Sequence, residues 1–192
     1  IVGWGAVERN GKNIKLLGDK PLIAYTIEAA KKSQLITHLI VSTDDEEIAA
    51  EGRRCGAEVP FLRPAALAGD TAAVGPAIMH ALESFEHHAN VVVDTLVLLE
   101  PTSPFRTAEH VRRAIERFRA GDCHSVISVC PLERKPENIF IKADHLLDRY
   151  TKEPQTAFTR RQDMGRLCRL NSAIYVVTKR DFIETGRLVV AP

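Results

Sequence analysis

Short apolar runs rich in β-branched residues recur along the chain, separated by longer polar segments. The runs are "HLIVST" (38–43), "EVPFL" (58–62), "TLVLLE" (95–100), "SVISVC" (125–130) and "SAIYVV" (172–177). Apolar runs of this length with many Val and Ile residues are typical of buried strands. The pattern therefore predicts a strand at each of these positions.

One segment before the first run and three segments between the first four runs have helical periodicity and helix-end signals. Pro21 stands at a first-turn position, and Thr107 is a typical N-cap residue. Gly56 and Gly121 stand where glycine commonly follows the end of a helix. We predict helices within residues 21–34, 44–56, 72–88 and 107–121.

Strands that alternate with helices indicate βαβ units. The predicted fold class is therefore α/β, with a doubly wound, mostly parallel sheet covered on both faces. In such sheets ligands bind beyond the carboxyl ends of the strands. The polar segments "STDD", "LLEPTSP" and "SVCP" all follow strands at that edge.

The alternation breaks in residues 131–167, which are polar and contain three prolines. A segment of this length is either an active-site lid or an arm that pairs with another subunit. An arginine cluster begins here and ends just before the last apolar run. It fits either a solvated hairpin or anion recognition, because the guanidinium fork matches carboxylate and phosphate. The cluster comprises Arg160, Arg161, Arg166 and Arg169.

Composition is that of a globular chain of 192 residues, which fits a single domain, 1–192. Its 26 Lys and Arg residues against 25 Asp and Glu residues leave a net charge of +1. We therefore predict neither nucleic acid nor a membrane surface as a partner, and an anionic ligand must meet a local group of bases.

The cysteines form no CxxC pair, so neither a zinc site nor a disulfide framework is indicated, and we expect reduced thiols in a cytoplasmic protein. No apolar run approaches the ~20 residues of a membrane span, and no signal peptide is visible. The chain begins at Ile1 without methionine, and we expect residues to be missing at both ends. The cysteines are Cys55, Cys123, Cys130 and Cys168.

Several segments together carry a family resemblance. They are "GKNIKLLGDKPLIAYTIEAA", "LIVSTDDEEIAAEGRRCGAEVPFLRPAALAGDTA", "LVLLEPTSPFRTAEHV", "SVISVCPLERKP", "TRRQD" and "RLNSAIYV", in this order. From Gly11 onward the chain resembles the acylneuraminate cytidylyltransferases, also called CMP-sialic acid synthetases.

This resemblance implies a Rossmann-like nucleotidyltransferase fold and transfer of CMP from CTP to the anomeric hydroxyl of a nine-carbon α-keto acid sugar, with release of pyrophosphate. It also implies Mg²⁺ as cofactor. The expected assembly is a homodimer, with a tetramer as an alternative, in which residues 131–167 form the dimerisation arm. The C-terminal part of the family domain is expected to lie outside this chain.

The resemblance also assigns site residues. Gly5, Lys12 and Asn13 match positions beside the nucleotide, and Arg63 matches an arginine near the cytosine. The sugar side is matched by Pro101, Thr102, Ser103, Asn138, Arg161, Arg169, Asn171 and Tyr175. Of these, Arg161 is implied to act in the partner's site, whereas Asn171 and Tyr175 are also explained as a strand polar residue and a half-buried aromatic.

Some positions depart from the family pattern. In the first loop, "IVGWGAVERN", Gly3, Ala6 and Val7 stand where the family has arginine, serine and lysine, and Asn138 replaces a lysine. The family's metal-binding aspartate pair is expected beyond the end of this chain. Two phosphate-facing cations are therefore missing from the loop.

Glu100, in "LLEPTSPFR", stands where the family usually has glutamine. It is explained either as a solvated or Arg-paired carboxylate or as a catalytic residue that meets a Mg²⁺ ion bridging the phosphates. The two prolines fix the backbone after the strand, so Thr102 and Ser103 are expected to form a rigid binding wall. Arg106 is expected to begin the next helix or to pair with a local acid, outside the site.

Three functions follow from these observations. The first is a cytidylyltransferase for an acylneuraminate-type sugar, with Glu100 and Arg161 as catalytic residues. The second is the same enzyme acting on another acidic sugar, such as KDO, pseudaminic or legionaminic acid. The third is a nucleotide-sugar-binding relative without transferase activity, because the first-loop cations are missing.

Overall fold

The computed structural model describes residues 2–4, 11–69, 73–132, 139–143, 146–149 and 167–190. The chain divides into two compact units. The first comprises Ile1–Ser128 with Ser172–Pro192, and the second comprises Val129–Asn171. The predicted site residues Gly5, Asn138 and Arg161 lie outside the described residues.

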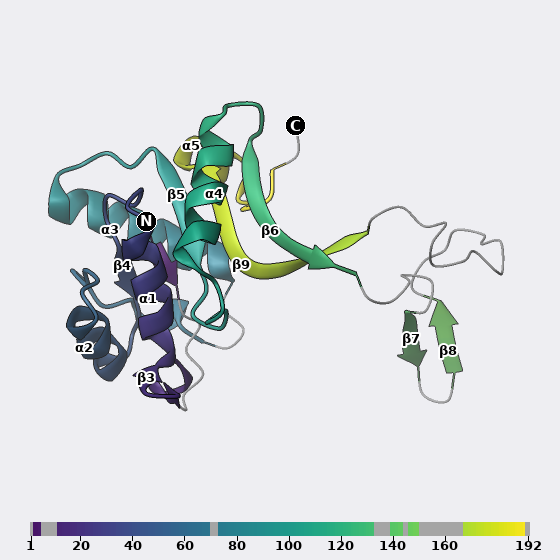
Figure 1. Ribbon diagram of the computed structural model, residues 1–192, viewed down its shortest axis with the longest axis horizontal. Helices are drawn as coiled ribbons and strands as arrows, with labels where there is room; N and C mark the ends of the chain where they lie inside the picture. Colours follow the sequence, from purple (N-terminus) through teal and green to yellow (C-terminus); the bar gives the residue numbers. More distant parts are fainter. Residues whose placement is uncertain are drawn as a thin grey trace. The chain divides into compact units, whose positions relative to one another are not determined.

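The main sheet belongs to the first unit and has parallel and antiparallel parts. Its strands are β1 (Val2–Trp4), β4 (Ile40–Ser42), β5 (Thr95–Leu99), β6 (Ser125–Pro131) and β9 (Cys168–Thr178), the last two of which continue into the second unit. β1 pairs in parallel with β4, which forms a parallel bridge with Glu58 on its other side. β1 lies beside β5, and the order then continues through β9 to β6 (Figure 1).

The predicted α/β class is confirmed, with β9 as an antiparallel exception. β9 runs antiparallel to β5, with Leu99 opposite Ile174. The predicted strand at 58–62 is reduced to the single bridge at Glu58. The last strand is longer than predicted, because it begins at Cys168.

The helices are found where the sequence predicts them, and short elements are added. Gly56 and Gly121 adopt positive φ angles of 87° and 81° directly after helix ends. The long helices are α1 (Leu22–Lys32), α2 (Glu46–Arg54), α3 (Val74–Ala89) and α4 (Ala108–Arg119), and α5 (Lys179–Thr185) is shorter. The remaining elements of the first unit are the 3-10 turns η1 (Lys12–Ile14) and η2 (Ala65–Leu67) and a hairpin of β2 (Leu16–Leu17) and β3 (Lys20–Pro21).

Side-chain caps fix the starts of helices that follow strands, among them α2 and α4. The Asp45 carboxylate accepts hydrogen bonds from the backbone N–H groups of Glu47 and Ile48, at 2.7 and 3.0 Å. The Thr107 hydroxyl accepts from the N–H of His110, whose ring nitrogen accepts from the N–H of Thr107, both at 3.3 Å. Such caps satisfy N–H groups that have no partner within the helix. The predicted N-cap at Thr107 is confirmed.

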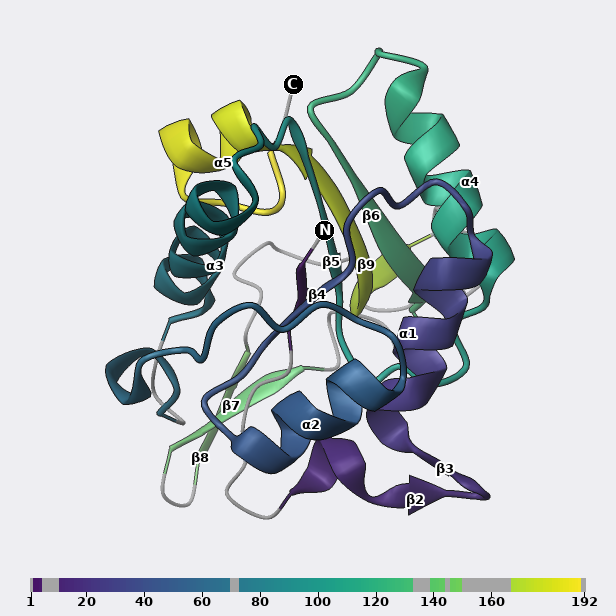
Figure 2. The same cartoon turned by 90° about the vertical axis from the view of Figure 1, so that its left-hand side faces the viewer.

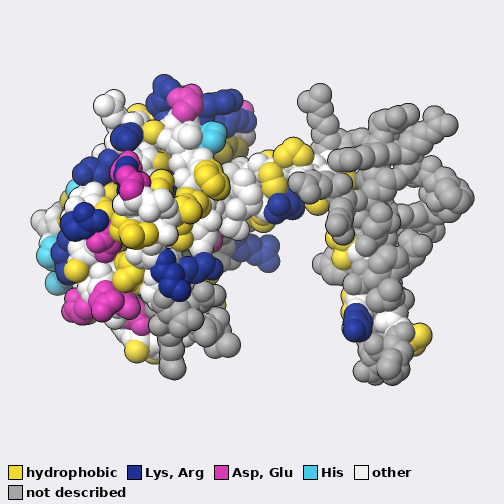
Figure 3. Space-filling model, turned by 60° about the horizontal axis from the view of Figure 1, so that its bottom comes forward, with side chains coloured by type: hydrophobic (Ala, Val, Ile, Leu, Met, Phe, Trp, Pro, Cys, Tyr) yellow, Lys and Arg dark blue, Asp and Glu magenta, His cyan; other side chains and the backbone are white. Residues whose placement is uncertain are grey.

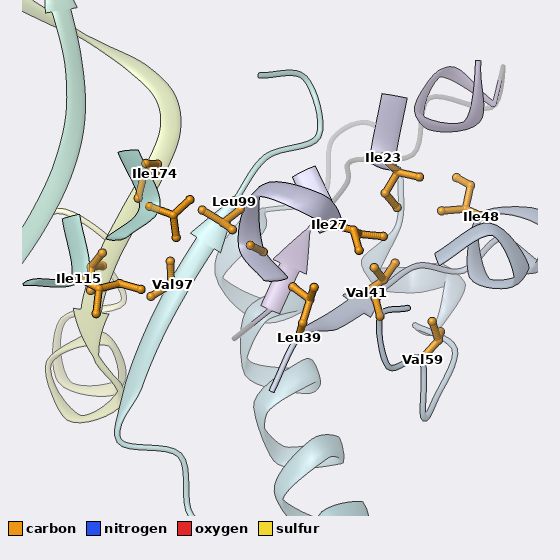
Figure 4. Packing of buried hydrophobic residues seen from close by; sticks show 14 of the residues in the cluster. Ile23, Ile27, Leu39, Val41, Ile48, Val59, Val97, Leu99, Ile115 and Ile174 are labelled. Carbon is orange, nitrogen blue, oxygen red and sulfur yellow. The ribbon is translucent and has the colours of Figure 1, made fainter. Parts of the chain in front are cut away.

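Both faces of the sheet are covered, and the residues of β5 alternate between them. Val97 and Leu99 pack with α1, α2 and α4, whereas Leu96 and Leu98 pack with α3 and α5. Figure 2 shows these two groups of helices on opposite sides of the strands, and Figure 4 shows the packing of the first group. Each side excludes water from an apolar cluster, which is the main stabilising contribution to such a fold.

The described part of the second unit contains a hairpin. β7 (Phe140–Ala143) pairs with β8 (Leu146–Arg149) in antiparallel register. Outside the hairpin, the N–H of Leu132 donates to the carbonyl of Leu167 at 2.9 Å. The role of residues 131–167 as a dimerisation arm stays a prediction.

Charge is dispersed over the surface of the first unit. On the face drawn in Figure 3, Lys and Arg side chains are interspersed with Asp and Glu side chains. Within the part of the chain that the structure describes, no helix has the length and apolar character needed to cross a membrane. The four cysteines carry free thiols.

Candidate active site

The register of β5 and β9 brings two predicted site segments together. Because Leu98 lies opposite Tyr175 and Leu99 opposite Ile174, the residues that follow β5 lie beside residues 172–174 of β9. Glu100 is the first residue after β5. Residues 100–106, the wall segment, and the half-buried Tyr175 therefore belong to one end of this strand pair.

The wall segment folds as two successive turns. The N–H of Ser103 donates to the carbonyl of Glu100 at 3.3 Å, and the N–H of Arg106 donates to the carbonyl of Ser103 at 3.2 Å. Pro101 is buried, Ser103 is half-buried, and Thr102 is exposed. Two turns therefore lie where the prolines predicted a fixed backbone, and the role of Thr102 and Ser103 as a binding wall stays a prediction.

Arg106 is the main correction to the sequence-based interpretation of this segment. It precedes the N-cap of α4 and is only 6% exposed. Its guanidinium donates to the carbonyls of Glu100 and Ala173, at 3.1 and 2.7 Å, and to the hydroxyl of Thr26 in α1, at 2.6 Å. Neutral oxygens, rather than a local carboxylate, hold this side chain.

The ionisation of Arg106 and Glu100 is perturbed by burial. Burial lowers the pKa of Arg106 to about 10, an effect that the charge of Glu100 opposes. Burial likewise raises the pKa of the Glu100 carboxyl, which the hydroxyl of Thr102 and the charge of Arg106 oppose. That hydroxyl lies 3.4 Å from Glu100 Oε2. A carboxyl that retains its proton more readily than usual can donate a hydrogen bond as well as accept one.

The surroundings of Glu100 do not make a metal centre by themselves. Within the described ranges, no group of three or more His, Cys, Asp or Glu side chains could hold a metal ion. Magnesium takes anionic carboxylate oxygens, whereas burial disfavours the anionic form of Glu100. A Mg²⁺ requirement stays a prediction.

β9 is distorted beside the wall segment. Ser172 has a positive φ of 57°, which is uncommon for a residue with a Cβ atom. The N–H of Ile174 donates to the side-chain hydroxyl of Ser128 at 2.8 Å, and the hydroxyl of Tyr175 donates to that of Ser172 at 3.1 Å. Ser172 was missed in the sequence analysis, although it lies within the motif "RLNSAIYV".

A second group of polar residues lies at the end of β4. The Arg63 side chain is fully buried, and its Nη2 lies 3.9 Å from Asp44 Oδ1. The N–H of Arg63 donates to the carbonyl of Thr43 at 2.8 Å, which places the residue just before the cap of α2. Burial lowers the pKa of Arg63, and the charge of Asp44 opposes this shift. The guanidinium is thus a desolvated cation at a strand end.

The predicted nucleotide residues of η1 pack near this group. Asn13 is buried and Lys12 is exposed. η1 packs against both α1 and α2. The remaining predicted residues, Arg169 and Asn171, belong to the second unit, where both are exposed. The structure therefore groups the nucleotide residues around α2 and the sugar-wall residues around the end of β5.

Solved structures of two synthetases share this α/β fold. The whole chain superposes on 78% of a CMP:2-keto-3-deoxy-manno-octonic acid synthetase complexed with CTP, with a TM-score of 0.68 and 13% identity. The chain also superposes, over 99% of its length, on 78% of a 4-diphosphocytidyl-2C-methyl-D-erythritol synthase from Anaerococcus prevotii, with a TM-score of 0.62 and 13% identity. At these identities the similarity establishes the fold alone.

Sequence comparison is more specific. The cytidylyltransferase family model matches residues 10–184, so the chain belongs to the cytidylyltransferase family and is a nucleotidyltransferase. It is 37% identical to CMP-N,N'-diacetyllegionaminic acid synthase of Legionella pneumophila, over 94% of this chain and 76% of the relative. It is 36% identical to post-translational flagellin modification protein B of Campylobacter coli, over 90% and 72%. It is 32% identical to N-acylneuraminate cytidylyltransferase of Escherichia coli, over 93% and 42%.

Proposed function

We propose that this enzyme transfers CMP from CTP to the anomeric hydroxyl of a nine-carbon α-keto acid sugar and releases pyrophosphate. The observation that carries the proposal is the similarity along nearly the whole chain to relatives named for this chemistry. Relatives at 37% and 32% identity are named for legionaminic acid and for an N-acylneuraminate, respectively. Both names describe acidic sugars, so the proposal commits to this class of acceptor.

The proposed reaction needs alignment more than covalent chemistry. The sugar hydroxyl attacks the α-phosphorus and loses its proton to the medium, its oxygen forms the new P–O bond, and the bond to pyrophosphate breaks. The protein contributes by aligning the two substrates and by stabilising charge on the phosphate oxygens. In this proposal Lys12, Asn13 and Arg63 bind the nucleotide, because η1 packs against α2 and Arg63 is bonded to Thr43 just before the cap of α2.

The segment after β5 is proposed to bind the sugar. The hydroxyls of Thr102 and Ser103 are accessible, and the preceding Pro101 is buried and fixes the turn. Glu100 would accept hydrogen bonds from the sugar, since its carboxyl lies beside the Thr102 hydroxyl at the start of this segment. This assignment favours a substrate contact over a metal ligand. A Mg²⁺ ion, if bound with the nucleotide, would supply charge neutralisation at the phosphates.

The central experiment measures pyrophosphate release by the full-length protein with CTP, Mg²⁺ and one sugar at a time. The panel comprises N-acetylneuraminate, N,N'-diacetyllegionaminate, pseudaminate and KDO, and UTP replaces CTP as the nucleotide control. We expect release with CTP and at least one nine-carbon acid. Release with KDO alone would contradict the proposed acceptor class, and absence of CTP binding would contradict the proposal as a whole.

A matched pair of variants tests the sugar wall. Thr102→Val removes an exposed hydroxyl after β5, and Thr95→Val makes the same change at the start of the strand. Thr102→Val should raise the KM for the sugar about tenfold, the effect of losing one hydrogen bond of ordinary strength. Thr95→Val should leave it unchanged. Equal effects of the two variants would remove Thr102 from the site.

A second candidate function is nucleotide-sugar binding without transfer. It is favoured by the sequence of the first loop, where Gly3 and Val7 replace the arginine and lysine of the family pattern. Measurable binding of CTP or of the CMP-sugar, without pyrophosphate release from any sugar, would establish it. Restoring the cations by Gly3→Arg with Val7→Lys should then create transferase activity.

We also propose a homodimer in which residues 131–167 place Arg161 in the partner's site. If each site combines Asn13 of one subunit with Arg161 of the other, mixing Asn13→Ala and Arg161→Ala proteins should restore about a quarter of the sites. Subunit exchange is verified with tagged chains. Complete inactivity of verified mixed dimers would contradict the role in trans.

A further inference from the structure

The buried guanidinium of Arg106 connects segments that are far apart in the sequence. Its acceptors are the carbonyl of Glu100, six positions away, the hydroxyl of Thr26, 80 positions away, and the carbonyl of Ala173, 67 positions away. These atoms belong to the end of β5, to α1 and to β9, respectively. One side chain therefore connects the end of β5 and β9 to α1, a helix that covers the sheet.

The acceptor in β9 lies at the distorted part of that strand. Ala173 follows Ser172, whose positive φ redirects the backbone, and precedes Ile174, whose N–H is bonded to the Ser128 side chain. A distortion of this kind turns backbone groups out of the regular ladder. The Arg106 guanidinium takes up the Ala173 carbonyl there, so it stabilises the local shape of β9.

The same guanidinium closes the wall segment. The carbonyl of Glu100 accepts from Arg106 Nη1 at the beginning of the segment, and the backbone N–H of Arg106 donates to Ser103 at its end. Thr102 and Ser103 lie between these two points. Their orientation toward a ligand therefore depends on a side chain of a residue that is itself only 6% exposed.

We propose that Arg106 is a positioning residue for the sugar half of the active site, which holds the 100–106 turn against β9 and α1 without touching the substrate. The proposal rests on the proposed function, because it assigns the wall to the sugar. It predicts that loss of the guanidinium affects sugar use more strongly than nucleotide binding, because the side-chain hydrogen bonds of Arg106 go to the wall segment, to β9 and to α1.

The test compares variants of the full-length protein. Arg106→Met removes the charge and all side-chain hydrogen bonds, Arg106→Lys retains the charge without the fork, and Thr26→Val removes only the acceptor in α1. Arg112→Met is the control, because Arg112 is an exposed arginine of α4 that pairs with Glu109. Melting temperature, the Kd of CTP and the KM and kcat for the sugar are measured for each variant.

We expect Arg106→Met to raise the KM for the sugar about tenfold or more and to change the Kd of CTP less than about twofold, because misplacement of a binding wall weakens the interactions that it makes. Arg106→Lys should recover part of the loss, and Thr26→Val should show a smaller change in the same direction. Arg112→Met should match the wild type. If Arg106→Met does not fold, Arg106→Lys and Thr26→Val carry the same comparison.

A purely structural role predicts a different pattern. In that case the variants lose melting temperature while the KM for the sugar and the Kd of CTP stay unchanged or change in parallel, and this result would overturn the proposal.

A second readout does not require turnover. The titration of the Glu100 carboxyl is followed by ¹³C NMR. Burial raises the pKa of this carboxyl, whereas the Thr102 hydroxyl and the Arg106 charge lower it.

Because the positive charge of Arg106 lowers the pKa of Glu100, Arg106→Met should raise it further and Arg106→Lys should not. This outcome is expected even if the wild type releases no pyrophosphate with any sugar, so the two proposals can fail separately. An unchanged Glu100 titration in Arg106→Met would show that the turn is not held as described and would overturn the positioning role.

Discussion

Two buried arginines, one beside the end of β4 and one beside the end of β5, are held in different ways. Arg63 lies near a carboxylate, at 3.9 Å from Asp44, whereas Arg106 donates to two carbonyls and a hydroxyl. Burial lowers the pKa of both. The Asp44 carboxylate partly neutralises the buried charge of Arg63, whereas Arg106 is stabilised mainly by hydrogen bonds to neutral oxygens and in addition by the charge of Glu100.

In our proposals the two arginines have different roles, since Arg63 binds the nucleotide and Arg106 positions the wall segment. The Arg63–Asp44 pair connects neighbouring parts of one strand–helix unit, and Asp44 retains 27% of its side-chain exposure. The bonds of Arg106 connect three elements, so its removal breaks one side-chain hydrogen bond to each of the wall segment, β9 and α1. We therefore expect stability to depend mainly on Arg106 and nucleotide affinity mainly on Arg63.

The largest expected effect is on the free energy of unfolding of Arg106→Ala. Leaving buried acceptors without their donor should cost about 3 kcal/mol, measured by urea denaturation. Arg112→Ala, on the exposed face of α4, should lie within about 0.5 kcal/mol of the wild type. A loss below about 1 kcal/mol in Arg106→Ala would contradict the description of Arg106 as a connecting residue.

Arg63→Met should have a smaller effect on unfolding, about 2 kcal/mol, because its carboxylate neighbour is partly accessible to water. The same variant should weaken CTP binding about tenfold or more, measured by calorimetry, since a cation at a binding site is lost. Combining it with Asp44→Asn should recover part of the stability and none of the affinity. Recovery of affinity in the double variant would place Arg63 outside the nucleotide site.

The helix caps that follow the two strands should differ by less. Asp45→Ala and Thr107→Ala should each lower the free energy of unfolding by about 1 kcal/mol. Asp45 accepts two hydrogen bonds at 2.7 and 3.0 Å, whereas Thr107 accepts one at 3.3 Å, so we expect the larger loss for Asp45. Urea denaturation of the two variants in parallel measures the difference, and a reversed order would contradict it.

Glu100→Gln should have the smallest effect on stability, within about 0.5 kcal/mol, and it should depend on pH. Because the folded-state pKa of Glu100 is raised, its contribution is fully present below the ordinary value of 4.5 and is lost as the pH rises through the raised value. Glutamine carries no such loss, so the variant should be slightly more stable than the wild type at pH 7 but lose this advantage below 4.5. Thermal unfolding at both pH values measures it.

The same variant distinguishes the two interpretations of Glu100. We expect Glu100→Gln to shift the sugar KM and to leave the Mg²⁺ concentration for half-maximal rate unchanged. A higher Mg²⁺ requirement with an unchanged sugar KM would instead identify Glu100 as a metal ligand.

The sequence predicted the elements whose signals are local. The periodic segments became α1 to α4, and Thr107, Gly56 and Gly121 mark helix ends as predicted. The turn after β5 followed from its prolines. Short elements such as η1 and the β2–β3 hairpin have no periodicity and were missed.

The contacts of Arg106 could not be predicted from local patterns, because two of its three acceptors lie 67 and 80 positions away. The antiparallel direction of β9 was likewise not specified by "SAIYVV", since the apolar run is compatible with either direction. The positive φ of Ser172 was also not predictable from the residue type, because serine does not favour this conformation. Family resemblance supplied the candidate residues, and their grouping required the fold.

The long sequence separation of the Arg106 contacts also has a consequence for folding kinetics. Its acceptors in α1 and β9 come together only after most of the chain has been ordered, and closing such long loops is entropically costly. We therefore expect these bonds to form after the folding transition state. Loss of the guanidinium should then accelerate unfolding and leave the refolding rate nearly unchanged, which would make this arginine a determinant of the lifetime of the native enzyme.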